Sequence, residues 1–172
     1  MRYILKVLLA AVAIAVLFAT PSHAADAETA LLRSYIGNWS GSSVLRGGDQ
    51  PEAFSCRLKV TQGRLVKINY AGRCSLVNMN LSVSGTIYFN DQANRYEATM
   101  RSNVGLSAGA VGVARGGSIV FRLSEKQSDR VGTPLQINAI LELSGKQIVV
   151  DFTVELNRSG QTLTTKVPFQ RQ

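Results

Sequence analysis

Apolar and polar residues alternate along almost the whole chain after residue 37, and this pattern limits the fold more than any other feature of the sequence. In the clearest run, apolar side chains occupy every second position: Ile148, Val150, Phe152, Val154 and Leu156. A period of two residues is typical of β-strands with one face in a core and the other in water. The chain is therefore predicted to be all-β.

Short turn signals separate the alternating runs and indicate how the strands connect. They are Gln62-Gly63, Asn90-Asp91, Arg115-Gly116-Gly117, Ser144-Gly145 and Ser159-Gly160. Strands joined by such tight turns pair as antiparallel neighbours. About 8 to 10 strands of this kind form a meander, and a meander with one apolar face closes into an up-and-down barrel that hides its edges. The alternative fold is a two-sheet β-sandwich.

The first 24 residues have the layout of a secretory signal peptide: a short basic region, an apolar run and small residues before a cut. The apolar run is shorter than the roughly 20 residues that a membrane-spanning helix needs. Cleavage is predicted after Ala24, with Ala27 as the second choice. Residues 1–24 would then be a cleaved leader and residues 25–172 one mature domain, located in the periplasm or secreted.

One short helix is expected after the leader, near residues 26–36. Asp26 can cap its start and Gly37 can end it. No later segment is apolar enough to suggest a transmembrane helix, so the mature chain is predicted to lack one.

Removal of the leader changes the chemistry that the chain can perform. Without Arg2 and Lys6, the 19 basic residues become 17 against 11 acidic ones, so the mature chain has a net charge of +6. The cut also removes His23, the only histidine. Nucleophilic triads, most general acid–base sites and most zinc and iron sites use histidine. The sequence therefore predicts a protein that is not an enzyme and has no metal or cofactor.

The mature chain contains two cysteines, Cys56 and Cys74. An even number of cysteines in an exported protein favours a disulfide. In the chain-entropy model, closing a loop of about 18 residues stabilises the fold by about 3 kcal/mol. A redox-active pair would instead favour the closer Cys-x-x-Cys spacing, which is absent here.

The residues from 32 to 44 join a helical turn to a Gly-x-Trp motif, Gly37-Asn38-Trp39, at the start of the first expected strand. This opening resembles that of the calycin barrels, which include lipocalins, avidins, fatty-acid-binding proteins and nitrobindins. The chain is also similar to small exported proteins of alpha-proteobacteria, and the residues that carry this second resemblance are Gly41, Cys56, Arg57, Gly72 and Cys74.

The calycin resemblance implies that Trp39 closes one end of a barrel and that the interior holds a small apolar ligand. The residues expected to line that interior are Trp39, Phe54, Tyr70, Phe89, Phe121 and Phe152. The same side chains could instead fill the barrel completely, since the free volume inside depends on the number of strands. Haem binding through a histidine, as in some members of the group, is not expected in a chain whose mature part has none.

A second functional hypothesis comes from a basic segment. No acidic residue occurs between residues 53 and 90, whereas five cations lie close together: Arg57, Lys59, Arg64, Lys67 and Arg73. If Cys56 pairs opposite Tyr70 around a turn at Gly63, Lys59 faces Lys67, and opposed like charges destabilise a strand pair. The cluster could therefore bind an acidic glycan, a lipid headgroup or another protein. Nucleic acid is not expected, because no aromatic stacking residues alternate with these cations.

Overall fold

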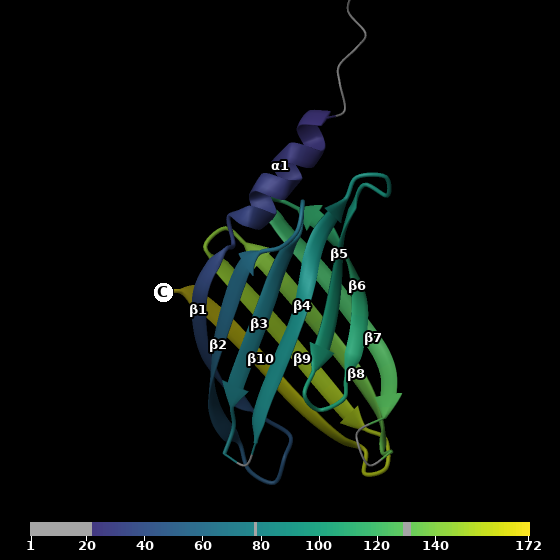
Figure 1. Ribbon diagram of the computed structural model, residues 1–172. Coiled ribbons are helices and arrows are strands. Elements are labelled where there is room, and N and C mark those ends of the chain that lie inside the picture. Colours follow the sequence, from purple (N-terminus) through teal and green to yellow (C-terminus); the bar gives the residue numbers. More distant parts are fainter. Residues whose placement is uncertain (1–21, 78, 129–131) are drawn as a thin grey trace, which may run out of the picture.

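The computed structural model describes residues 22–77, 79–128 and 132–172 of the 172-residue chain. This part of the chain forms one helix followed by ten strands (Figure 1). The elements are α1 (Ser22–Arg33), β1 (Gly37–Leu45), β2 (Glu52–Gln62), β3 (Ile68–Ser75), β4 (Asn80–Asn90), β5 (Arg95–Ser102), β6 (Ser107–Arg115), β7 (Ser118–Ser128), β8 (Pro134–Ser144), β9 (Gln147–Leu156) and β10 (Gln161–Arg171).

Each strand pairs antiparallel with the next one along the chain, and β10 pairs with β1 to close the barrel. The predicted up-and-down barrel is therefore confirmed and the alternative sandwich is wrong. The alternation that predicted the strands also separates the two faces of the wall. In β2, for example, Phe54, Cys56 and Val60 are buried inside the barrel, whereas Arg57 and Lys59 are exposed outside it.

Helix α1 stands at one end of the barrel, which we call the helix end (Figure 1). The opposite end, where β1 finishes, is called the far end. The helix begins at Ser22, so Asp26 lies inside it and not at its start as predicted, and it stops at Arg33, three residues before the predicted end at residue 36. It closes with tight backbone hydrogen bonds, from Tyr35 N–H to the Leu32 carbonyl and from Ile36 N–H to the Arg33 carbonyl, both 3.1 Å.

The predicted leader, residues 1–24, lies outside the described residues except for its last three, which belong to the first turn of α1. Over the described part of the chain, no helix has the length and apolar character needed to cross a bilayer.

The register between β2 and β3 differs from the one predicted. Cys56 lies opposite Cys74 rather than Tyr70, and Lys59 lies opposite Ala71 rather than Lys67. The expected repulsion between Lys59 and Lys67 across the strand pair is therefore wrong.

The difference arises in the turn between the two strands. The chain reverses around Leu65, whose backbone is left-handed with φ 55°, and the Gly63 N–H donates to the Lys67 carbonyl at 2.9 Å. The centre of the turn is thus two residues later than the predicted Gly63. The residue opposite Cys56 therefore changes by four positions, from Tyr70 to Cys74. Because side chains alternate with a period of two, a shift by an even number of residues keeps every residue on its predicted face.

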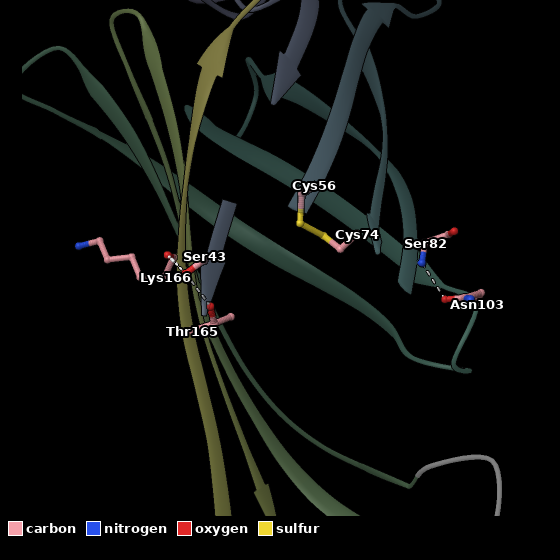
Figure 2. The surroundings of a disulfide bond; sticks show 7 residues. All are labelled: Ser43, Cys56, Cys74, Ser82, Asn103, Thr165 and Lys166. Atoms are coloured by element: carbon pink, nitrogen blue, oxygen red, sulfur yellow. Dashed lines mark hydrogen bonds between the residues drawn. A yellow bond between two sulfur atoms is a disulfide. The ribbon is translucent and has the colours of Figure 1, made fainter. Parts of the chain in front are cut away.

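The seam between β1 and β10 is the most weakly paired part of the wall. Continuous pairing there covers Trp39 to Gly41, and one further bridge joins Arg46 to Thr164. In the gap, the Ser43 hydroxyl donates to the Lys166 carbonyl at 2.6 Å (Figure 2). A side chain therefore supplies part of the contact that backbone groups make elsewhere in the wall.

Candidate functional site

The helix end of the barrel interior is closed by aromatic packing. Trp39 is only 1% exposed, and its indole N–H donates to the Tyr35 carbonyl at 2.9 Å. Leu32 and Tyr35, next to the end of α1, are also buried. The guanidinium group of Arg171 covers the indole ring and donates to the Ile36 carbonyl at 2.8 Å. The predicted closure of one end by Trp39 is confirmed.

A second aromatic layer lies below this closure. The ring of Tyr96 packs edge-on against Phe89 and Phe121, with centroid distances of 5.1 and 6.4 Å. Its hydroxyl donates to the carboxylate of Glu28 on α1, which ties the helix to the barrel. Burial, followed by this hydrogen bond to a carboxylate, raises the pKa of Tyr96. The helix end is therefore a closely packed core.

The interior is different toward the far end. There, several inward-facing apolar side chains are only half-buried and do not pack against the aromatic core. Strand register places them on the inner face of five different strands, and they are Val83, Met100, Leu123, Phe152, Val154 and Leu163, which we call the far-half lining. Their partial exposure means that solvent reaches the inner wall of this half. The inward-facing Phe54, Leu135 and Ile137 are exceptions, because all three are buried.

Tyr70 is an inward-facing polar group near the boundary between the two halves. Its hydroxyl donates to the Thr99 carbonyl at 2.8 Å, and Gly85 leaves room for the ring, since a Cβ at that glycine would lie 2.6 Å from the hydroxyl oxygen. Burial raises the pKa of Tyr70 to about 12. The hydroxyl is therefore neutral near pH 7 and already has a partner.

All six aromatic residues predicted to line the interior face inward, but they divide between the two halves. Trp39, Phe89 and Phe121 lie in the packed helix end. Phe54, Tyr70 and Phe152 lie in the rest of the interior. The aliphatic members of the far-half lining were missed as site residues. Their alternation was visible in the sequence, but no sequence signal marked which end of the barrel would be filled.

The predicted disulfide joins Cys56 and Cys74 on the inner face of β2 and β3, with a Cα–Cα distance of 4.0 Å (Figure 2). The two residues are directly opposite each other in the strand pair. The bond therefore reinforces a hairpin that the backbone ladder already forms, at the edge of the far half.

The predicted basic cluster divides between two places. Arg57 and Arg73 lie directly opposite each other on the outer face of β2 and β3, with Lys59 beside them. The remaining two cations, Arg64 and Lys67, lie in the turn at the helix end, where the Lys67 ammonium sits 4.6 Å from the centroid of the Tyr88 ring. The five residues therefore do not form one surface.

A further arginine, which the sequence did not link to the cluster, joins the outer surface. Arg101 on β5 lies opposite Ser84 on β4, and Ser84 lies opposite Ala71, the partner of Lys59. We call Arg57, Lys59, Arg73 and Arg101 the basic wall. The ion pair found among the described residues is Arg95–Glu97, so no cation of the basic wall has a carboxylate partner there.

The basic wall contains a hollow of about 580 Å³. Its lining has two arginines, four neutral polar side chains and no carboxylate: Ala71, Gly72, Arg73, Ser82, Val83, Ser84, Arg101, Ser102 and Asn103. The Asn103 side chain accepts from the Ser82 N–H at 2.8 Å and donates to the Asn80 carbonyl at 2.7 Å, which fixes the rim of the hollow (Figure 2). A second hollow, of about 420 Å³ beside β1 and β10, includes the carboxylate of Asp151. The first hollow is therefore the one suited to an anion.

No protein-family model and no curated protein matches the sequence. Solved structures with a similar fold include Rv2717c from M. tuberculosis, at 12% identity and a TM-score of 0.63, covering 83% of this chain and 97% of that one. The S-type phycobiliprotein lyase CPES from Guillardia theta is 11% identical with a TM-score of 0.56, covering 86% of this chain and 97% of the lyase. These similarities support the calycin-like barrel. The resemblance to exported proteins of alpha-proteobacteria stays a prediction.

The comparison corrects one sequence-based prediction. The lack of histidine in the predicted mature chain suggests a protein that is not an enzyme. A protein named as a lyase nevertheless has a similar fold. The prediction is overturned, because a barrel of this type gives no ground for excluding catalysis.

Proposed function

We propose that the protein is an exported binding protein that holds a small apolar ligand in the far half of its barrel. The observation that carries the proposal is the contrast between the two halves of the interior. Inward-facing side chains are buried at the helix end, whereas the far-half lining is apolar and partly exposed to solvent. When a ligand covers an apolar surface that water reaches, the free energy falls by about 25 cal/mol per Å² of apolar area covered.

Most polar groups nearby already have partners, which supports an apolar ligand, and among the described residues the inward-facing carboxylate of Glu125, opposite Ile137 on β8, is the exception. The Thr165 and Ser43 hydroxyls are 3.0 Å apart and hydrogen-bonded to each other, and the Tyr70 hydroxyl is bonded to Thr99. Hydrogen-bonding groups that already have partners add little to the recognition of a polar ligand. Binding would therefore come mainly from contact with the far-half lining.

Two features support export to the periplasm or beyond the cell. The first is the signal-peptide pattern of residues 1–24. The second is the disulfide between Cys56 and Cys74, because such bonds persist mainly in oxidising compartments. The ligand would then be one that occurs in the cell envelope or outside the cell.

The proposal can be tested with Nile red, a neutral probe whose fluorescence rises in apolar surroundings. Val154→Trp should abolish binding of the probe, because it places a large ring among the far-half lining. Thr153→Trp is the matched control: Thr153 precedes Val154 on β9 and faces outward, so the same ring should leave binding unchanged.

Native mass spectrometry of the protein purified from a periplasm provides a second measurement on the unmodified chain. A retained small molecule, lost in Val154→Trp but kept in Thr153→Trp, is the expected result. The proposal is wrong if the natural protein neither retains a molecule nor binds the probe. Equal loss of probe binding in both variants would also overturn it, since binding would then not depend on the interior.

The alternative function, docking on an acidic glycan, a lipid headgroup or a protein through the basic residues of the β2–β3 hairpin, is favoured by a different observation. The hollow in the basic wall has two arginines and no carboxylate. The arginines of this hollow face outward, and Val83 is the one residue that it shares with the far-half lining, so both functions can belong to the same protein.

A further inference from the structure

Two exposed apolar side chains lie between β3 and β4 at the far end of the barrel. Val77 is 77% exposed and Met79 is 45% exposed. The connection that carries them is held by two hydrogen bonds: the Leu76 N–H donates to the Met79 carbonyl at 2.9 Å, and the Val77 N–H donates to the Glu52 carboxylate. The backbone is thus anchored to the barrel while both apolar side chains extend into water.

The basic wall borders this connection. Arg73 lies two residues before the end of β3, Arg57 lies opposite it on β2, and Arg101 is the next-to-last residue of β5. A strand rises about 3.3 Å per residue, so Arg73 lies within about 13 Å of Val77 along the chain. An arginine side chain is long enough to cover part of that distance. Apolar and cationic groups are therefore combined on one side of the far end.

We propose that this side of the far end docks on a bilayer that contains anionic phospholipids. Val77 and Met79 would enter the outer part of the bilayer, and the hollow between Arg73 and Arg101 would receive lipid phosphates. Guanidinium groups form paired hydrogen bonds with phosphate, and apolar side chains leave water at the headgroup boundary. A soluble acidic polymer would neutralise the arginines but leave Val77 and Met79 in water.

A similar combination at the helix end is less suited to this role. Leu65 is 85% exposed and Val66 is also exposed, in the turn that carries Arg64 and Lys67. However, the Lys67 ammonium already lies over the Tyr88 ring, and the hollow that contains Arg73 and Arg101 lies toward the far end. The helix-end turn therefore provides a matched control rather than the docking surface.

Docking at the far end would bring the far-half lining close to the bilayer. An apolar ligand could then pass between membrane and barrel with little exposure to water. This consequence rests on the proposed ligand-binding function, whereas the docking itself rests only on outer-surface residues.

Docking can be measured by flotation of the mature protein with vesicles. Vesicles of phosphatidylcholine mixed with phosphatidylglycerol should carry the protein upward, and vesicles of phosphatidylcholine alone should not. Binding should weaken as salt is added, because mobile ions screen the exposed charges. Val77→Ser combined with Met79→Ser should reduce the vesicle-bound fraction several-fold, whereas Leu65→Ser combined with Val66→Ser should leave it unchanged.

The cationic contribution needs variants with equal changes in net charge. Arg73→Gln combined with Arg101→Gln should reduce the partition coefficient at least tenfold. The control, Arg115→Gln with Arg122→Gln, changes two exposed arginines of β6 and β7 and should reduce it less than twofold. All variants should still bind Nile red without vesicles, which separates a failure of docking from a failure of ligand binding.

Three results would overturn the proposal. The first is equal flotation with neutral and anionic vesicles. The second is loss of binding in the Leu65 and Val66 variant but not in the Val77 and Met79 variant. The third is binding to a sulfated polymer that depends on Arg73 and Arg101 while vesicle binding does not, which would identify a soluble polyanion as the partner.

Discussion

Arg171, the residue before the C-terminus, lies over the indole ring of Trp39, with its guanidinium carbon 4.6 Å from the ring centroid. The two residues are also paired across the seam between β1 and β10. One contact therefore holds the two ends of the barrel sheet together and covers the aromatic closure at the helix end.

Loss of this contact should destabilise the closure. Arg171→Met removes the charge and its hydrogen bonds, and we expect it to lower the free energy of unfolding by about 1–2 kcal/mol. Trp39→Ala should cost more, roughly 3–5 kcal/mol, because it empties a buried aromatic site. Urea unfolding followed by circular dichroism measures both.

Trp39 is the only tryptophan of the chain, so tryptophan fluorescence reports on its surroundings. In the natural chain, its emission should shift to longer wavelength on unfolding. An unchanged spectrum would contradict its burial.

The two glycines Gly112 and Gly109 of β6 provide a matched test of interior packing. A Cβ at Gly112 would lie 2.5 Å from the ring of Phe121, whereas a Cβ at Gly109 would meet only the Ala98 carbonyl, at 3.8 Å. Gly112→Ala should therefore lower stability by about 1–3 kcal/mol. Gly109→Ala should be neutral or raise stability by up to about 1 kcal/mol, because alanine restricts the unfolded chain. Similar melting temperatures for the two variants would show that the ring of Phe121 is free to move.

The disulfide should stabilise the barrel without being needed for its topology. Replacing both Cys56 and Cys74 with alanine should reduce stability by about 3 kcal/mol in the chain-entropy model, while the circular dichroism spectrum stays that of a β-protein. Thiol titration of the denatured, unreduced natural protein should detect no free thiol. Two free thiols would contradict the bond.

Stability should fall at alkaline pH. An unfolded tyrosine ionises near pH 10, whereas burial raises the pKa of Tyr70 to about 12. Between these values the unfolded chain holds fewer protons than the folded one. The stabilisation is complete below about pH 10 and decreases by about 1.4 kcal/mol per pH unit for this residue as the pH rises toward 12. Urea midpoints across this range should decline less steeply in Tyr70→Phe, and parallel slopes would mean that Tyr70 ionises normally.

The sequence was sufficient to predict the barrel because the alternation of side chains is a local property of each strand. It also assigned the inner and outer faces correctly, even where the register was wrong. The register error at the first turn arose because Leu65, a non-glycine residue with a positive φ, gives no sequence signal for a turn. The apolar Val66 next to it extends the pattern of a strand, although it is exposed in the turn.

The functional surfaces were harder to predict because they depend on neighbours across the sheet. Arg101 reaches the basic wall through Ser84 and Ala71, residues on two other strands. Likewise, Met100 and Leu163 share the far-half lining although more than 60 residues separate them in the sequence. Such contacts follow from strand order and register, which a linear pattern does not contain.

The interrupted seam between β1 and β10 has a consequence for how the barrel moves. Opening of the wall should begin there, because the gap between Gly41 and Arg46 has few backbone hydrogen bonds to break. Amide hydrogens on both sides of the gap should exchange with deuterium before those of the fully paired β7–β8–β9 region. The seam would then act as the hinge line of the barrel, and its opening rate would limit how fast a bulky molecule inside could leave sideways through the wall.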